Sequence, residues 1–279
     1  MEPYRIRVLR PAEVSLAVDW AAAEGWNPGL HDAAAFLAQD PEGFLVGELD
    51  GAPVAVISAV RFDGFAFVGF YIVTPGLRGR GYGLRLWQAA MARLAGATIG
   101  LDGVVAQRDN YRKSGFALAH RNVRYEGVGR APKPPASGLE PLARVPFAEL
   151  AAFDTRHAGW AREKFLRGWL ALPEAQGWAL RRDGRLCGYG VVRRCRRGAK
   201  IGPLFAATED AAEALFGQLA AFAPGEPLFL DPPLPNTRAV ALAQRHGMQP
   251  VFETARMYAG PTPTLPLDRV YGITTFELG

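Results

Sequence analysis

Three glycines alternate with two other residues in one short segment of the chain, Arg78–Gly83. A predicted strand over residues 65–73 precedes this segment, and Pro75 and Gly76 end that strand. A glycine loop that opens a helix brings successive backbone N–H groups onto one anion, and the helix dipole adds to the attraction. Arginines in such a loop favour a polyphosphate over a single carboxylate. The segment therefore predicts a site for a phosphate-bearing ligand.

Two common phosphate-binding motifs do not fit this loop. The Walker loop needs a lysine followed by serine or threonine, and no lysine is present here. The dinucleotide fingerprint needs a third glycine where this chain has Leu84 or Leu86. The residues after the loop predict a helix instead, with an apolar face of Leu84, Trp87, Met91 and Leu94.

The loop resembles the acetyl-CoA signature of the GNAT superfamily of N-acetyltransferases, V-x-P-x-x-R-G-x-G-x-G-x-x-L. The residues that fill this signature are Val73, Pro75, Arg78, Gly79, Gly81, Gly83 and Leu86. A second segment, Tyr111–Phe116, resembles the Y-x-K-x-G-F motif that closes the fourth helix of that fold. Two motifs in the right order and at the right spacing are more specific than a glycine-rich turn alone.

The resemblance implies where acetyl-CoA binds. In the family, the strands that correspond to 65–73 and 99–102 splay apart, and the thioester enters the gap. The pantetheine arm then pairs with the backbone around Ile72 and Val73. The cofactor contacts expected in the loop are Arg78, Gly79, Arg80, Gly81, Tyr82 and Gly83. Family members often carry Asn and Ala where this chain has Val104 and Gln107, so Asn110 is the expected substitute contact.

The chemistry follows from that ligand. A neutral amine attacks the acetyl carbonyl directly, and holding both substrates in one cleft supplies much of the rate. The N–H near Val73 is expected to polarise the carbonyl. Tyr111 matches the family's usual general acid, with a pKa of about 10 that suits a basic thiolate. The general base is expected to be Asp102, Glu24 or a water chain. The first half has no cysteine, which argues against a covalent acetyl-enzyme.

The segment between the first two predicted helices contains unusual loop residues. A helix that starts at Pro11 runs into Glu24, Trp26 and Asn27, followed by a Pro-Gly turn. The family resemblance implies that this segment lines the acceptor pocket, so these three residues are expected acceptor contacts. The alternative is that the tryptophans simply cap the core.

Length and composition suit two soluble domains. The chain has 279 residues, 49% of them hydrophobic, with a net charge of +5. No lysine-rich run points to nucleic acid, and neither a signal segment nor a membrane span is expected. Cys187 and Cys195 are too few for a disulfide framework or a zinc site, so no metal and a cytoplasmic location are expected.

The plan of the first half repeats in the second. Asp183-Gly184 repeats the turn Asp50-Gly51, Ile201–Phe205 repeats 68–72, and Leu230-Asp231 repeats Leu101-Asp102. Asn236 and Ala239 also restore the family's N-x-x-A. We therefore expect residues 1–126 to form a catalytic domain, 127–140 a linker, and 141–279 a GNAT-like domain with a C-terminal strand.

The second copy lacks the chemical groups of the first. Its loop reads Thr208-Glu209-Asp210, which makes a good helix N-cap but repels a pyrophosphate, and Ala243 replaces Tyr111. This half is expected to bind no CoA and to shape the acceptor site. The residues considered for that role are Lys200, Asp231 and Trp178.

The sequence therefore predicts an α/β (α+β) protein of two tandem GNAT-like domains, each a mixed, mostly antiparallel twisted sheet flanked by helices. The expected reaction is acetyl transfer from acetyl-CoA to a small-molecule amine or peptide amine. Two alternatives remain open: another acyl donor or acceptor at the same site, and a CoA-binding regulatory protein without turnover.

Overall fold

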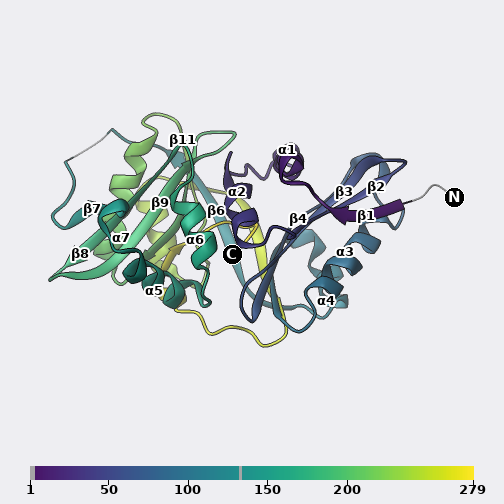
Figure 1. Cartoon of the computed structure of the whole chain (residues 1–279). Helices are drawn as coiled ribbons and strands as arrows, with labels where there is room; N and C mark the ends of the chain where they lie inside the picture. The colour runs from purple at the N-terminus through teal and green to yellow at the C-terminus, as the bar shows by residue number, and fades with distance from the viewer. Residues whose placement is uncertain (1–3, 132–133) are drawn as a thin grey trace.

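The structure of the chain is a computed structural model that describes residues 4–131 and 134–279. The strands are β1 (Tyr4–Val8), β2 (Phe44–Leu49), β3 (Ala52–Arg61), β4 (Phe65–Val73), β5 (Thr98–Val104), β6 (Ala117–Val128), β7 (Leu139–Pro141), β8 (Ala175–Arg182), β9 (Arg185–Arg194), β10 (Ala199–Ala206), β11 (Pro227–Leu230), β12 (Gln249–Ala259) and β13 (Val270–Gly272). The helices are α1 (Ser15–Ala23), α2 (Asp32–Gln39), α3 (Tyr82–Arg93), α4 (Arg108–Lys113), α5 (Phe147–Ala158), α6 (Glu163–Leu170), α7 (Glu209–Leu219) and α8 (Thr237–Arg245). Residues 4–131 are called the first half below, and residues 134–279 the second half (Figure 1).

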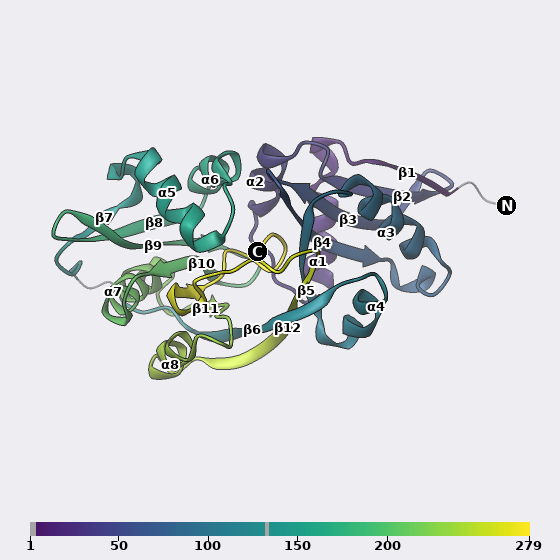
Figure 2. The same ribbon diagram turned by 90° about the horizontal axis from the view of Figure 1, so that it is seen from below.

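One continuous sheet joins the two halves, and the long strand of each half is paired within the other. The order is β1-β2-β3-β4-β5-β12-β6-β11-β10-β9-β8-β7, with β13 paired to β10. Thus β12 from the second half lies between β5 and β6, and β6 from the first half pairs with β11. Figure 2 shows β6 and β12 running side by side from one half to the other. Neither half completes its sheet without a strand from the other.

This pairing corrects the expected start of the linker. Val128 and Gly127 pair with Pro227 and Leu228 of β11, so residues 127 and 128 are strand residues. Residues 132–133 of the expected linker lie outside the described residues. The expected C-terminal strand exists as β13, although it is only three residues long.

The internal repeat is visible in the turns. Asp50 and Gly51 have φ of 52° and 79°, and Asp183 and Gly184 have 49° and 75°. Two consecutive residues in the left-handed region form the hairpin turn that matches strand twist, and Asp-Gly is a preferred pair for it. The same turn therefore closes the hairpins β2–β3 and β8–β9.

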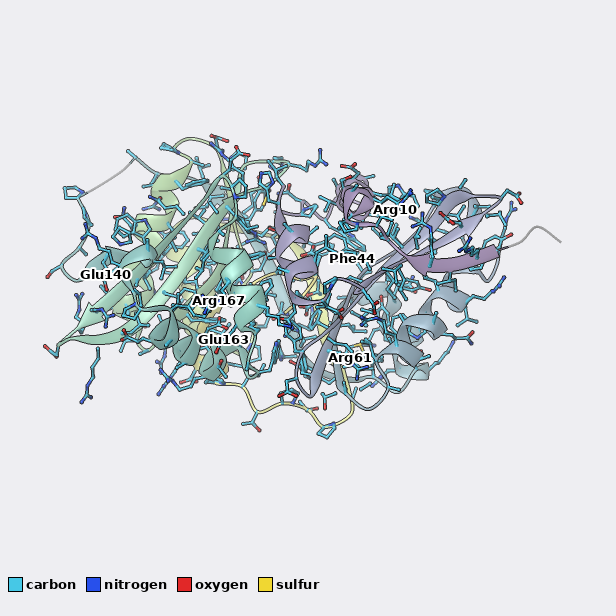
Figure 3. All side chains as sticks on the ribbon, viewed as in Figure 1. Arg10, Phe44, Arg61, Glu140, Glu163 and Arg167 are labelled. Atoms are coloured by element: carbon cyan, nitrogen blue, oxygen red, sulfur yellow. The ribbon has the colours of Figure 1, made fainter. Side chains whose placement is uncertain are left out.

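Helices cover both faces of the first half's sheet. Helices α1 and α2 lie on one face and α3 and α4 on the other (Figure 1). Phe36 of α2 packs on Phe44, which is fully buried and labelled in Figure 3, and on Phe165 of α6. The first half is therefore joined to the second through this helix pair as well as through the sheet.

The predicted apolar face of α3 is partly wrong. Trp87 and Leu94 are buried as expected, together with Leu86 and Ala90, but Leu84 is 59% exposed. Leu84 lies in the first turn of the helix, where it lines a cavity and does not reach the core. The helical spacing of apolar residues does not distinguish a side chain that packs in the core from one that lines such a cavity.

Two buried ion pairs fasten the exchanged strands, and each joins one half to the other. Asp102 on β5 accepts bonds from Nε and Nη2 of Arg256 on β12, at 2.9 and 2.6 Å. Asp231, which follows β11, accepts bonds from Nε and Nη2 of Arg124 on β6, at 2.8 and 2.7 Å. All four side chains are at most 3% exposed. Each arginine also follows a left-handed glycine, Gly115 or Gly247, by nine residues, so the pairs are related by the repeat.

We predict that Arg256→Met lowers the free energy of unfolding by about 3–5 kcal/mol, because it leaves the Asp102 carboxylate buried without its cation. Arg196→Met, which removes an exposed ion pair with Asp19, is the matched control and should cost less than about 1 kcal/mol. Urea denaturation followed by circular dichroism measures both. Equal losses in the two variants would contradict this role for the buried pair.

Candidate functional site

A cavity of about 720 Å³ opens where β4 and β5 part. The two strands pair in parallel only over Phe65–Val68 and Thr98–Leu101. Beyond this point Phe70 takes a left-handed conformation, with φ of 46°, and the register between β3 and β4 shifts. The cavity is lined by the ends of β4 and β5, the loop before α3, α4, the loop after α1, β12 and the C-terminal segment. The parting of the strands therefore creates the site.

Each glycine of the loop is required for a local structural reason. Gly79 and Gly81 have φ of 76° and 86°, which side-chain-bearing residues rarely adopt. Gly81 caps α3, whose first N–H groups have no partner within the helix and are available to an anion. A Cβ on Gly83 would lie 2.8 Å from Val73 Cγ2 and 2.8 Å from Tyr71 Oη, so Gly83 allows α3 to pack closely on β4. All three glycines line the cavity.

The other residues expected to contact the cofactor from this loop differ in whether their side chains reach the cavity. Arg78 lines the cavity, but its Nε donates to the carbonyl of Val73 at 2.9 Å and its Nη2 donates to Glu24. Arg80 is exposed and does not line the cavity. The Tyr82 ring lies against that of Tyr4, 5.0 Å between centroids, and also outside the lining. Of these side chains, only Arg78 borders the cavity.

Tyr111 forms part of the cavity wall beside β5. A Cβ on Gly103 would lie 2.3 Å from Tyr111 Cε2, so the ring can rest on the strand only because this residue is glycine. Trp87 packs on the same ring at 5.6 Å. Burial, with a smaller contribution from Tyr71, raises the pKa of Tyr111 to about 12. The hydroxyl therefore keeps its proton at neutral pH and is a proton donor.

Asn110 and Gln107 lie next to each other on the rim of the cavity. The Asn110 amide donates to Gln107 Oε1 at 2.7 Å, and both residues line the cavity with Ile72 and Val73 of β4. Asn110 is therefore placed where a contact to a bound cofactor is feasible, and that role stays a prediction.

Asp102 lines the cavity, but its carboxylate is engaged. Arg256 bonds to both oxygens, and the Asn122 amide donates to Oδ1 at 2.8 Å. Burial raises the pKa of Asp102, while Arg256 and Asn122 act to lower it. Burial by itself would lower the pKa of Arg256. The Asp102 carboxylate and, to a lesser extent, the Tyr258 hydroxyl outweigh burial and hold that pKa above its usual range. The pair fixes the strands, which disfavours Asp102 as the base that moves a proton in turnover.

The loop after α1 is held by β6 and by the second half. Arg124 donates to the Trp26 carbonyl, and Lys200 Nζ donates to the Asn27 carbonyl at 2.8 Å. The Asn27 side chain exchanges two bonds with the backbone of Arg197, at 3.0 and 2.9 Å. Trp26 and Glu24 line the cavity, whereas Asn27 does not. Asn27 therefore anchors the loop from behind, contrary to the expectation that it contacts the acceptor.

The second half contributes lining residues that sequence reasoning missed. They are Phe252 and Thr254 of β12 and Phe276 and Glu277 of the C-terminal segment. Lys200 and Asp231 instead support the loop and the strands, and Trp178 packs on the second half's own core. No motif marked the missed residues. The one available signal was an acidic side chain, Glu277, among the apolar and threonine residues that end the chain.

The corresponding place in the second half is filled by the chain itself. Strands β10 and β11 pair in parallel over Ala199–Ile201 and then part, as β4 and β5 do. Here β13 pairs with Leu204 and Phe205 of β10, and the Ile273 N–H donates to the Asp231 carbonyl at 3.0 Å. The β13 segment occupies the space that the cavity occupies in the first half.

Within the described residues, no three His, Cys, Asp or Glu side chains gather as a metal site would require. No helix in the described ranges is long and apolar enough to cross a membrane.

Comparisons with known proteins agree with this geometry. The acetyltransferase (GNAT) family matches residues 12–116, and an acetyltransferase (GNAT) domain family matches residues 150–272. The chain is 31% identical over its whole length to holothin acyltransferase of Pseudoalteromonas sp. (strain SANK 73390), covering 97% of that protein. A putative acetyltransferase from Pyrococcus horikoshii has a TM-score of 0.86 at 24% identity, with 100% of this chain and 97% of that chain covered. A tandem GNAT protein of the clavulanic acid pathway has a TM-score of 0.63 at 17% identity, covering 93% of this chain and 100% of its own.

The raised pKa of Tyr111 predicts a specific pH dependence of stability. In the unfolded chain this tyrosine ionises near pH 10, while in the folded chain it stays protonated to about 12. The contribution of Tyr111 to the free energy of unfolding is therefore complete below pH 10. It is lost as the pH rises toward 12, by about 1.4 kcal/mol per pH unit. Urea unfolding at pH 8, 10 and 11 should show a steeper decline for the wild type than for Tyr111→Phe. Parallel declines would mean that the hydroxyl is not buried.

Proposed function

The chain belongs to the GNAT superfamily of acyltransferases, in its tandem form, and we propose that it transfers the acetyl group of acetyl-CoA to an amine. The proposed reaction is direct attack in a ternary complex. The observation that supports it most is the position of one cavity. This cavity reaches from the glycine loop at the start of α3, past the parted ends of β4 and β5, to the Tyr111 side chain.

The proposed cofactor site uses the loop and the β4 backbone. The pyrophosphate would bind at the start of α3, to the backbone of Gly79, Gly81 and Gly83. The pantetheine arm would pair with β4 at Ile72 and Val73. The Arg78 side chain, which bonds to Val73 and Glu24, is close enough to the loop to turn toward a phosphate. Arg80 and Tyr82 would contribute through their backbone, since their side chains lie outside the cavity.

The proposed chemistry needs an oxyanion donor, an acid and a base. The Val73 N–H would polarise the thioester carbonyl. Tyr111 would give its proton to the leaving thiolate, a role supported by its position in the cavity wall, and its raised pKa keeps the hydroxyl protonated until then. Glu24 and Asp102 were the candidate bases, and both are bonded to arginines. Neither is proposed further as the base.

The acceptor is proposed to be a small-molecule amine. The cavity lining also includes Trp26, Phe252 and Phe276, which suits an acceptor with an aromatic or apolar body. The relative named holothin acyltransferase supports a small molecule over a peptide. Other acyl donors remain the second candidate, because that name specifies an acyl group and not acetyl. We also propose a cytoplasmic location, since both cysteines are free thiols.

We predict that Gly81→Glu abolishes CoA binding, because the new side chain and its charge would occupy the place of the phosphates. Gly96→Glu is the matched control. Gly96 also has a positive φ, of 85°, and open space around its Cβ, but it does not line the cavity. Isothermal titration with CoA should give one site per wild-type chain, a similar affinity for Gly96→Glu and no binding for Gly81→Glu. Unchanged affinity in folded Gly81→Glu, or two sites per chain, would refute the assignment.

We predict that Tyr111→Phe lowers kcat by about 10²-fold or more with acetyl-CoA affinity little changed, because the thiolate loses its proton donor. Tyr125→Phe, a buried tyrosine of the second core, is the control and should leave kcat unchanged. CoA release with a panel of amines measures kcat, and calorimetry measures affinity. A wild-type rate in Tyr111→Phe would assign the proton to another group.

A further inference from the structure

The last residues of the chain form a buried segment between the two halves. Residues 270–278 are all buried, and the segment is fixed by Arg162, which donates to Thr274 Oγ1 at 2.9 Å and is itself paired with Asp154. The segment crosses two glycines related by the repeat. A Cβ on Gly202 would lie 2.4 Å from the Thr274 carbonyl oxygen, and one on Gly69 would lie 2.4 Å from that of Glu277. Both close contacts depend on glycine.

The contact at Gly69 brings Glu277 to the point where β4 and β5 part. Gly69 directly follows the last β4 residue that pairs with β5, and both Gly69 and Glu277 line the cavity. The Glu277 carboxylate is near enough to Asp102 to raise the pKa of that residue. The third-last residue of the chain is thus placed at the inner end of the proposed acyl site.

Glu277 is 3% exposed, and no cation within the described residues forms an ion pair with it. The charged groups of neighbouring elements that feel its charge are Asp102, Arg124, Arg193 and Lys200. Arg124 bonds to Asp231, Arg193 to Asp32, and Lys200 to the Asn27 carbonyl. Each cation near Glu277 is therefore already engaged by another group.

A local turn orients the carboxylate. Thr275 Oγ1 donates to Glu277 Oε2 and accepts from the Glu277 N–H at 3.1 Å. In the part of the chain that the structure describes, the other oxygen, Oε1, has no hydrogen-bond partner and is not sealed from the cavity. A buried carboxylate with one oxygen left without a hydrogen bond lowers the stability of the fold, unless a ligand supplies the missing donor.

We propose that Glu277 binds the amino group of the acceptor and accepts its proton. The aromatic groups Trp26, Phe252 and Phe276 border the same cavity and would hold an apolar acceptor body beside this carboxylate. The acceptor class is therefore an amine attached to an aromatic or apolar group. This inference rests on the proposed function and assigns the base that Asp102 and Glu24 do not supply.

The proton balance of the step is complete with two side chains. The bound ammonium first gives one proton to Glu277, which releases it to solvent. The neutral nitrogen then forms a bond to the acyl carbon, and Glu277 takes the second proton that this nitrogen loses. The C–S bond then breaks, and the thiolate takes the proton of Tyr111. The protonated Glu277 and the tyrosinate return to their starting states through solvent, so that the amine proton replaces the acyl group on sulfur.

The test compares two probes of similar size, phenethylamine and 2-phenylethanol, titrated into the protein saturated with CoA. The wild type should bind the amine at least about tenfold more tightly than the alcohol, because only the amine binds as a cation and so supplies the countercharge that the buried carboxylate lacks. Glu277→Gln should lose this preference while its CoA affinity and thermal midpoint stay within error. Glu24→Gln removes the exposed carboxylate of the cavity lining and should keep the preference.

Turnover separates proton transfer from binding alone. With phenethylamine and acetyl-CoA, Glu277→Gln should lower kcat by about 10²-fold while its affinity for CoA stays unchanged. Glu277→Asp keeps the charge and provides the comparison if the glutamine variant does not fold. It should retain the amine preference but lose at least about tenfold in kcat, because the shorter side chain misplaces the base.

Each outcome decides one claim. Wild-type protein that binds both probes alike, or Glu277→Gln that keeps the preference and the rate, would overturn the role of Glu277. Loss of the preference in Glu24→Gln instead would transfer the role to Glu24. Protein that does not bind CoA at all would refute the proposed function itself, and calorimetry with CoA alone distinguishes that case.

Discussion

The exchange of β6 and β12 between the halves is the constraint on which the rest of this structure depends. Each exchanged strand carries an arginine, Arg124 or Arg256, that bonds to a buried aspartate of the other half. A buried pair of this kind is costly to break, because one charge is then left without its partner. The halves therefore hold each other in one arrangement, and the second half cannot be removed without opening the sheet of the first.

That arrangement explains how one repeat serves the other. The second half has lost the glycine loop and the tyrosine, but it holds the loop after α1 through Lys200 and the backbone of Arg197. Its own strand gap is filled by β13, and the chain continues from there into the cavity of the first half. The second half thus supplies part of the cavity wall, while the glycine loop and Tyr111 both lie in the first half.

The ligand-facing groups divide by how they are held. The glycine loop and Tyr111 are set by local geometry, a helix start and a glycine contact within one half. Trp26 and Glu277 depend on the packing of the two halves. Arg124, which bonds to the Trp26 carbonyl, is itself paired with Asp231 of the second half, and Glu277 reaches the cavity through the close approach at Gly69. We expect the first group to be tolerant of changes in the second half and the second group to be sensitive to them.

The sequence by itself determined the family and the internal repeat, and it singled out the glycine loop and the tyrosine that border the cavity. These features depend on local spacing: Arg78 to Gly83, Tyr111 with Gly115, and two Asp-Gly turns. It also indicated several strands and helices of the first half, since their apolar periods are local. Tertiary structure alone decided the exchange of strands, the bonding of Asp102 and Asn27, and the arrival of Glu277 at the cavity. These features join residues up to 208 positions apart, as between Gly69 and Glu277. No local pattern records such a pairing, because it is fixed only when the two halves pack together.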